Sequence, residues 1–456
     1  MKTIIIGGGL TGLAAAYKLL KNGISDVTIL EKDMEPGGMA ASYHIGNYHI
    51  EKYYHHIFES DTELISLITD MGLGKDLQWL KGTTGYHING KIYPMNTPLE
   101  LLRSPLSIFD LMWLARIVLT IKWKKDVSGL DDVTAKEWIL DNAGNSVYER
   151  FFEPLLRSKF GNNHDLVSAA WLFGRIRIRS NRSASGERLG YLRGGFYRFI
   201  KRLTDSIIEM GGEVRTACEV SGIHVAGGAV CGVYVGAGEH RKPDCGCDGG
   251  CDCDCNCDVV ISTVPPHTLS RLVRTAVGAG DGAGSGFRGM HDVPYQGTAC
   301  ALFGMDKPLL NNIYWLNIKS DVPFGAVVEH TNFLPVADYG KHLVYVTAYL
   351  QDADDQRWRC TEQEVIDSYL IGLERLFPDF SKSNVRWWRI TRNIDTAPVY
   401  LTGYARNIPP YSTDLTGLYL AGMFSDANYP ERSMNGSILA GFECADEIMR
   451  NRGLFA

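Results

Sequence analysis

Glycines at fixed spacing near the N-terminus are the residues of this chain best suited to binding a phosphate group. Gly7, Gly9 and Gly12 form a G-x-G-x-x-G pattern. The first glycine of such a pattern permits a tight turn, the second lets the backbone approach a pyrophosphate, and the third allows close helix–strand packing. Glu31 follows at the distance where a carboxylate accepts hydrogen bonds from ribose hydroxyls. The spacing predicts a dinucleotide-binding site.

The elements around these glycines occur in the order that such a site requires. Residues 2–6 form a short apolar run, a helical apolar pattern begins at Leu10, and residues 26–30 indicate a second buried strand that ends at Glu31. The phosphate is expected at the helix N-terminus, where backbone N–H groups and the helix dipole are positive.

A glycine pair, Gly37-Gly38, decides between FAD and NAD. Together with Glu31 it resembles the flavin-containing amine oxidase and protoporphyrinogen oxidase-like superfamily, in which an acid followed by Gly-Gly belongs to the FAD site. Met39 stands where that family often has an arginine. The resemblance implies FAD as the cofactor.

Further stretches extend the resemblance over most of the chain. They are residues 191–196, 218–223, 258–266, 417–423 and 435–437. Pattern and resemblance together imply cofactor contacts from Gly7, Gly9, Leu10, Thr11, Gly12, Glu31, Lys32, Gly37, Gly38, Met39, Val220, Thr263, Pro265, Gly422, Met423, Asn435, Gly436 and Ser437.

The expected fold class is α/β, with two discontinuous domains. An FAD-binding Rossmann-like domain of the GR2 type is expected from residues 1–44, 190–290 and 405–456. Residues 45–189, which are helix-rich, and residues 291–404, which alternate like strands, are expected to form an α+β substrate-binding domain over the flavin.

Two stretches of the predicted substrate domain carry candidate chemistry. His55 and His56 are candidate catalytic residues, either as acid/base groups or as hydrogen-bond partners of the flavin; a structural aromatic cluster is an equal alternative. Arg175, Arg177 and Arg179 alternate with period two, so a strand here would point all three guanidiniums to one face and bind an anionic substrate. A solvated or ion-paired face is the alternative.

One absence bears on the reaction. Amine oxidases of the superfamily typically carry a lysine near flavin N5, but the matching stretch, residues 297–302, contains none, and Lys307 lies beyond it. Amine oxidation is therefore less favoured.

A cysteine-rich stretch, residues 245–258, holds six of the eleven cysteines. It lies between two predicted strands, so we expect a surface insertion over residues 239–257. Cys251, Cys253, Cys255 and Cys257 are candidate ligands for a soft metal. Disulfides and free thiols are the alternatives.

Composition and charge limit the kinds of partner and the location expected for this chain. A formal net charge of -6 argues against a nucleic-acid partner. The N-terminus lacks the pattern of a signal peptide, and scattered cysteines fit a cytoplasmic protein. The apolar stretch 99–123 carries too many charges to span a bilayer. A helix lining an apolar substrate cavity is expected there, with peripheral membrane contact as the alternative.

The resemblance favours an FAD-dependent oxidoreductase of the protoporphyrinogen oxidase-like branch. It implies dehydrogenation of a C–C or C–N bond in a largely apolar, anionic small molecule by hydride transfer to flavin N5. The alternatives are nucleotide-sugar chemistry like that of UDP-galactopyranose mutases, isoprenoid oxidation like that of phytoene desaturases, amine oxidation and, more distantly, a non-enzymatic flavin-binding or metal-storage protein.

Overall fold

The structure is a computed structural model of the 456-residue chain. It describes residues 1–88, 90–124, 127, 129–178, 187–236, 255–274 and 293–454. The predicted residues Arg179, Cys251 and Cys253 lie outside these ranges. Among the helices within them, none combines the length and apolarity that crossing a bilayer requires.

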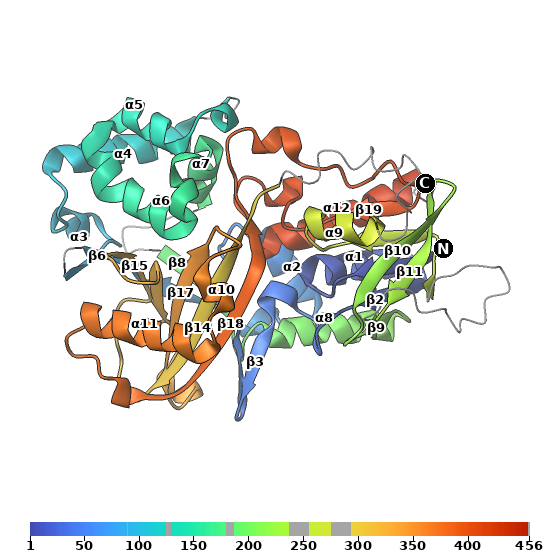
Figure 1. Cartoon of the computed structure of the whole chain (residues 1–456), viewed down its shortest axis with the longest axis horizontal. Coiled ribbons are helices and arrows are strands. Elements are labelled where there is room, and N and C mark those ends of the chain that lie inside the picture. Colours follow the sequence, from blue (N-terminus) through green and yellow to red (C-terminus); the bar gives the residue numbers. More distant parts are fainter. Residues whose placement is uncertain are drawn as a thin grey trace.

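A five-stranded parallel sheet forms the first layer (Figure 1). Its strand order is β19-β13-β1-β2-β9, and the strands come from three separate parts of the chain. Their bounds are β1 Lys2–Ile6, β2 Asp26–Leu30, β9 Glu213–Arg215, β13 Val259–Ser262 and β19 Leu418–Leu420. The strands are buried on both faces: Ile5 packs into one core cluster, while Ile4 and Ile6 pack into another.

Each face of this sheet is covered by different elements. One face carries α1 (Leu10–Lys21), α8 (Tyr197–Glu209) and α12 (Met434–Asn451), whose apolar residues share a core with Ile5. The other face carries α9 (Pro266–Arg274) and a three-stranded sheet. That sheet consists of β10 Val220–Ala226, β11 Ala229–Val235 and β12 Cys255–Asn256.

A seven-stranded sheet forms the second unit, with the order β18-β14-β17-β16-β15-β6-β7. Its strands are β6 Thr84–Ile88, β7 Lys91–Pro94, β14 Tyr295–Met305, β15 Trp315–Lys319, β16 Ala326–Glu329, β17 His342–Leu350 and β18 Val385–Pro398. Helix α11 (Glu362–Leu376) covers one face, and α10 (Gln356–Arg359) precedes it. On the other face, Cys300 and Tyr345 join the core of the parallel-sheet unit.

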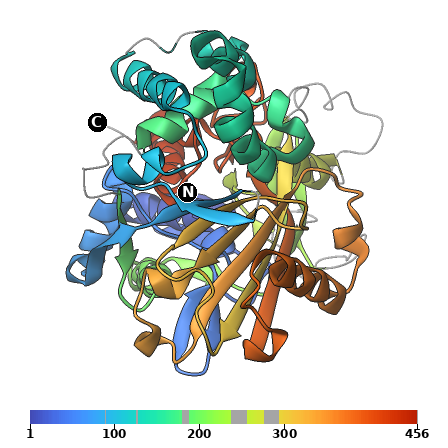
Figure 2. The ribbon, with the colours of Figure 1, turned by 90° about the vertical axis from the view of Figure 1, so that its left-hand side faces the viewer.

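Helices form a separate layer above this sheet (Figure 2). They are α3 Pro98–Leu102, α4 Ile108–Trp123, α5 Ala135–Val147, α6 Glu153–Phe160 and α7 Ala169–Ile178. The strand expected around Arg175–Arg179 is wrong, because the described residues there belong to α7. The apolar run before Arg175 packs Trp171, Leu172 and Phe173 into the core as a helix.

One hairpin, one antiparallel pair of strands from distant parts of the chain and one helix link the units. Strands β3 (Ser42–Ile45) and β4 (Tyr48–Glu51) pair with each other, and β5 (Leu77–Gly82) pairs with β8 (Glu187–Leu192). Helix α2 (Thr62–Asp70) packs on α12. These pairings bring residues 52–61 against both the parallel-sheet unit and the seven-stranded sheet.

Candidate functional site: a dinucleotide cradle facing a buried charged cluster

The turn between β1 and α1 has the geometry that its glycines predict. Gly7 has a φ of +103°, and a Cβ there would lie 2.4 Å from Thr263 Oγ1. A Cβ on Gly12 would lie 2.1 Å from the Gly7 carbonyl oxygen. Thr263 donates from Oγ1 to the Ile6 carbonyl at 2.8 Å, which fixes the turn after β13 against this loop. Side chains are therefore excluded where the backbone turns and where α1 packs.

The glycine pair closes over this turn. Gly37 N–H donates to the Gly8 carbonyl at 2.8 Å, and Gly37 and Gly9 form a parallel bridge. Gly37 and Gly38 both have positive φ, and a Cβ on Gly38 would lie 3.1 Å from Gly9 Cα. The two glycine segments thus form one backbone-lined cradle.

Glu31 lies at the floor of the cradle and is 6% exposed. Its carboxylate accepts from Gly8 N–H at 2.6 Å and from Asp33 N–H at 2.9 Å. Its carbonyl accepts from Cys218 N–H, which holds the start of β10 and the buried Val220 beside it. Lys32, in contrast, is exposed.

The start of α12 lies against the same sheet edge. Ser433 caps the helix by accepting from Gly436 N–H at 2.9 Å, and a Cβ on Gly436 would lie 2.4 Å from Asn428 Oδ1. Asn428 Nδ2 also donates to the Gly422 carbonyl at 3.1 Å. Asn428, which the motif did not single out, therefore joins the Gly422 turn to the helix N-terminus.

The side chains of Asn435 and Ser437, two predicted cofactor contacts, form hydrogen bonds within the protein. Asn435 Oδ1 accepts from Leu64 N–H at 2.9 Å, and its Nδ2 donates to Glu63 at 3.1 Å. Ser437 Oγ donates to the Ser433 carbonyl. Any contribution of these two residues to the cofactor would come from the backbone, as expected for an anion at a helix N-terminus.

These features fit an FAD molecule. The cradle, in which a Cβ on Gly7, Gly12 or Gly38 would be crowded, and two helix N-termini supply backbone donors for a pyrophosphate, and the buried Glu31 carboxylate supplies acceptors for a ribose. Pro265, which precedes α9, Met39 and Met423 lie on the turns around this cradle. Met39 Sδ accepts from Asn393 Nδ2 of β18 at 3.8 Å, which links the glycine loop to the seven-stranded sheet.

The segment that carries His55 and His56 is held by a buried carboxylate. Glu51, at 1% exposure, accepts from Phe196 N–H at 2.7 Å and from Tyr191 OH at 2.8 Å, and its carbonyl accepts from Tyr345 OH. Burial raises the pKa of this carboxyl. The Gly194–Gly195 turn, both glycines at positive φ, permits the approach to Glu51.

The two histidines differ in their surroundings. His55 Nδ1 donates to the Tyr53 carbonyl at 2.7 Å, so its Nε2 is the acceptor nitrogen, and burial lowers its pKa to about 4. His56 Nδ1 lies 3.1 Å from Tyr314 OH, within an aromatic cluster that includes Phe58 and Trp315. A neutral His55 can orient a ligand by hydrogen bonding but is a weak base near neutral pH.

A largely buried cluster of charged side chains lies just before the start of α12, and Arg175 is its one member that was a candidate from the sequence. Lys159 Nζ lies 3.2 Å from Glu431 Oε1, and Arg175 Nη1 lies 3.4 Å from the same oxygen. The Lys159 ammonium also lies 4.8 Å from the centre of the Trp171 ring. Arg432 Nη1 is buried and finds no hydrogen-bond partner among the described residues. Three cations thus surround one carboxylate, two residues before the cap of α12.

Burial and the neighbouring charges together set the pKa values of Lys159 and Glu431. It lowers the pKa of Lys159 to about 7, although Glu431 acts in the opposite direction. Burial also opposes ionisation of Glu431, but the neighbouring Lys159 and Arg175 charges hold its pKa below the usual range. A lysine that titrates near neutral pH is a feature of functional sites.

The predicted arginine row does not form one face. Arg175 pairs with Glu431, whereas Arg177 donates to the Ile121 and Lys124 carbonyls at the end of α4. Residues two apart on a helix point about 200° apart, so the period-two spacing separates them. Only Arg175 reaches the charged cluster.

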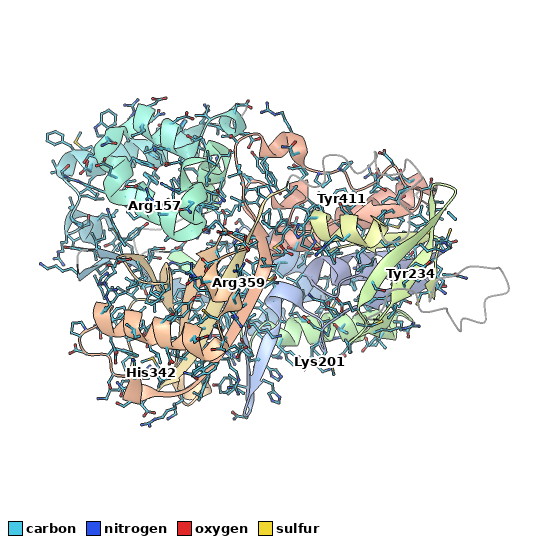
Figure 3. The ribbon with its side chains drawn as sticks, in the orientation of Figure 1. Arg157, Lys201, Tyr234, His342, Arg359 and Tyr411 are labelled. Carbon is cyan, nitrogen blue, oxygen red and sulfur yellow. The ribbon has the colours of Figure 1, made fainter. Side chains whose placement is uncertain are left out.

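The wall beside the cluster is aromatic and hollowed. Tyr54 OH lies 2.5 Å from Tyr349 OH. Tyr349 and Ser158 also line a cavity of about 540 Å³ between α6, β15 and β17. Arg157 of α6, labelled in Figure 3, lines the same cavity. Lys159 directly follows the cavity-lining Ser158 in α6, and its carbonyl accepts from Gln351 Nε2.

The remaining candidate residues lie away from this site. Lys307 is exposed beyond β14, and β14 itself contains no lysine.

Among the described residues, no group of three or more His, Cys, Asp or Glu side chains is placed to hold a metal ion. Cys255 Sγ lies 3.8 Å from Arg215 Nη1, and burial raises the pKa of the Cys257 thiol to about 12. With Cys251 and Cys253 outside the described residues, the metal site stays a prediction.

The sequence matches the family of flavin-containing amine oxidoreductases over residues 10–449. Coproporphyrinogen III oxidase of Staphylococcus aureus is 31% identical over 186 residues, which cover 36% of this chain and 37% of the relative. Protoporphyrinogen oxidase 2 of Arabidopsis thaliana is 27% identical over 37% of this chain and 34% of its own length. These alignments therefore span about a third of each relative.

Solved structures share the fold over nearly the whole chain. An Exiguobacterium protein provisionally named protoporphyrinogen oxidase has a TM-score of 0.73 at 19% identity, with 99% of both chains covered. Reduced UDP-galactopyranose mutase has a TM-score of 0.70 at 17% identity, covering 99% of this chain and 96% of the mutase. Family match, fold and cradle together establish that the chain belongs to the flavin-containing amine oxidoreductase family and is an FAD-dependent oxidoreductase.

Proposed function

We propose that this oxidoreductase dehydrogenates a C–C or C–N bond in a largely apolar substrate that carries an anionic group, as protoporphyrinogen oxidases do. When bound, FAD supplies at N5 the acceptor for a hydride from the substrate carbon. The protein's own side chains then have to bind and orient the substrate, exclude water and accept the remaining proton.

The observation that carries the proposal is the excess of positive charge beside the start of α12. Lys159, Arg175 and Arg432 surround the single carboxylate of Glu431, and Arg432 Nη1 is buried with no partner in the part of the chain that the structure describes. Leaving a buried guanidinium N–H unpaired is costly. A substrate carboxylate or phosphate at Arg432 would satisfy this donor and balance the charge.

The neighbouring aromatic wall fits the apolar part of such a substrate. Tyr54 and Tyr295 are half-buried and have raised pKa values because desolvation opposes their ionisation, so their hydroxyls stay neutral. Flat aromatic surfaces bury large areas of an apolar ring or chain. Lys159, with a pKa of about 7, accepts the released proton in its neutral form, which leaves Arg175 and Arg432 as the cations for the substrate anion.

Anaerobic loss of flavin absorbance in the purified holoenzyme tests this proposal. We expect a carboxylated porphyrinogen to reduce the flavin and its methyl ester to do so at least about tenfold less efficiently, because the ester cannot pair with Arg432. Arg432→Gln should abolish the preference for the free acid. Equal reduction by acid and ester would contradict the anionic subsite.

One alternative has a specific observation in its favour. The 15-cis-phytoene desaturase of Arabidopsis thaliana aligns with 100% of this chain at 21% identity. A polyene, an amine and a nucleotide sugar therefore belong in the same panel. If only the polyene reduces the flavin, the function is isoprenoid desaturation and not porphyrinogen oxidation. If the nucleotide sugar is isomerised only by enzyme with reduced flavin, the function is mutase chemistry.

A further inference from the structure

Large apolar side chains are gathered on the outer side of α3 and α4. The α3–α4 face comprises Leu99, Leu102, Ile108, Phe109, Met112, Leu119 and Trp123, which are between 44% and 71% exposed. Elsewhere in the described part of the chain, exposed apolar residues such as Ile208 and Ile371 lie on separate elements. A concentrated apolar face of this kind marks an interaction surface.

Helix α4 has two apolar sides with different environments. Leu114, Ile117 and Ile121 recur at helical spacing and are buried in the core. Met112, Leu119 and Trp123 recur at spacings of seven and four on the opposite side and face water. The inner side accounts for the folding of α4, whereas the outer side has no role in the packing of the part of the chain that the structure describes.

The exposed charged side chains at α3 and α4 are all positive. Glu100 and Asp110 are held in the capping boxes of α3 and α4, and Asp110 also pairs with Arg150. The exposed charged residues that remain on the segment are Arg103, Arg116, Lys122 and Lys124. A local excess of cations on a chain of net charge -6 is complementary to an anionic surface.

We propose that the α3–α4 face binds the surface of an anionic lipid bilayer, with α4 lying in the plane of the interface. Trp123 and the Arg116–Trp113 pair, whose guanidinium lies 4.9 Å from the indole centre, would sit at headgroup level, because Trp side chains favour that depth. The apolar row would enter the acyl boundary, as in interfacial amphipathic helices. A second copy of this chain fits less well, since a two-fold contact would bring the same cations together.

Figure 1 shows how this surface is placed. Helices α3 and α4 lie at the end of the molecule farthest from the parallel sheet and from the N- and C-termini. The bilayer would therefore contact the helical layer and leave the cofactor cradle in water. Lipid binding and flavin binding can then be measured independently.

Sedimentation of the FAD-loaded protein with vesicles tests the proposal. We expect binding to phosphatidylcholine–phosphatidylglycerol vesicles, and weaker binding at high salt or to pure phosphatidylcholine. Phe109→Ser with Trp123→Ser should lower the partition coefficient at least about tenfold, because two large apolar side chains no longer enter the interface. The control, Ile208→Ser with Ile371→Ser, also removes two exposed apolar side chains, but from α8 and α11. It should leave the partition coefficient unchanged.

The flavin content and the melting temperature of both double variants should match those of the unsubstituted protein. If the first variant proves unstable, Arg116→Gln with Lys122→Gln tests the same face by its charge. Unsubstituted protein that stays in the supernatant with every vesicle would overturn the proposal. So would an α3–α4 variant that abolishes a dimer while binding vesicles as before.

Discussion

The two halves of the site differ in how the chain builds them. The cofactor cradle is made of backbone from contiguous motifs, such as Gly7–Gly12 and Gly37–Gly38. The spacing of the glycines in these motifs is enough to predict the shape of the backbone turn. The charged cluster is made of side chains, and its partners Lys159 and Glu431 are 272 residues apart. A backbone site can be recognised from local sequence, whereas a side-chain site depends on how distant elements pack.

This difference predicts opposite responses to substitution. The cradle should be sensitive to added volume, because its defining feature is the absence of side chains. The cluster should be sensitive to the loss of a charge, because its members are largely shielded from water and balance one another.

The largest effect is expected from Glu431→Gln. It leaves Lys159 and Arg175 buried without their shared carboxylate, which should lower the free energy of unfolding by about 3 kcal/mol. Denaturant unfolding of the holoenzyme measures this change. Asp205→Asn removes the partner of the exposed Lys201 (Figure 3) and serves as the control, with a change under about 1 kcal/mol. A similar loss in both variants would contradict the distinct role of the buried cluster.

A methyl group added to a cradle glycine tests the cofactor half of the site. A Cβ on Gly9 would meet no atom closer than 3.9 Å, and Gly9 has a φ of -71°, so Gly9→Ala should fold normally. FAD affinity should nevertheless fall about 100-fold, because the methyl occupies the path of the pyrophosphate. Gly12→Ala, whose Cβ would clash with the Gly7 carbonyl, should lose both affinity and stability.

Flavin fluorescence titration and thermal unfolding separate these outcomes. If Gly9→Ala binds FAD as tightly as the unsubstituted protein, the phosphate does not approach at Gly9. In that case the assignment of the cradle fails, even though its backbone geometry is as expected.

The sequence predicted the cradle because Gly7 and Gly12 have local steric reasons and the spacing of Gly9 fits the approach of a phosphate. It failed at Arg175 and Arg177, since period-two spacing fits a strand but the preceding apolar residues pack as α7. It also missed Lys159 and Asn428, because a single lysine at a helix end or an asparagine in a turn has no distinctive pattern. Their importance appears only when Glu431, Gly422 and α12 are placed beside them.

The Lys159 charge should make stability depend on pH. The folded-state pKa of about 7 lies below the usual value of 10.5, so above pH 7 the unfolded chain binds the proton that the folded chain has released. The free energy of unfolding should therefore rise with pH, by about 2 kcal/mol between about pH 7 and about pH 9. Lys159→Met should remove this rise. An unchanged slope would show that Lys159 keeps an ordinary pKa in the folded protein.

The smallest effect is expected at His55, a candidate catalytic residue whose ring is held by a hydrogen bond to a backbone carbonyl. Its pKa of about 4 leaves it neutral throughout the neutral range, and its Nδ1 is committed to the Tyr53 carbonyl. Asn at this position keeps a neutral donor, so His55→Asn should lower kcat less than about fivefold and leave the pH profile of kcat/KM unchanged above about pH 5. The profiles of the two holoenzymes, measured with the best substrate of the panel, check this. If a limb near pH 6.5 disappears in the variant, His55 ionises during turnover, and the proton acceptor is this histidine instead of Lys159.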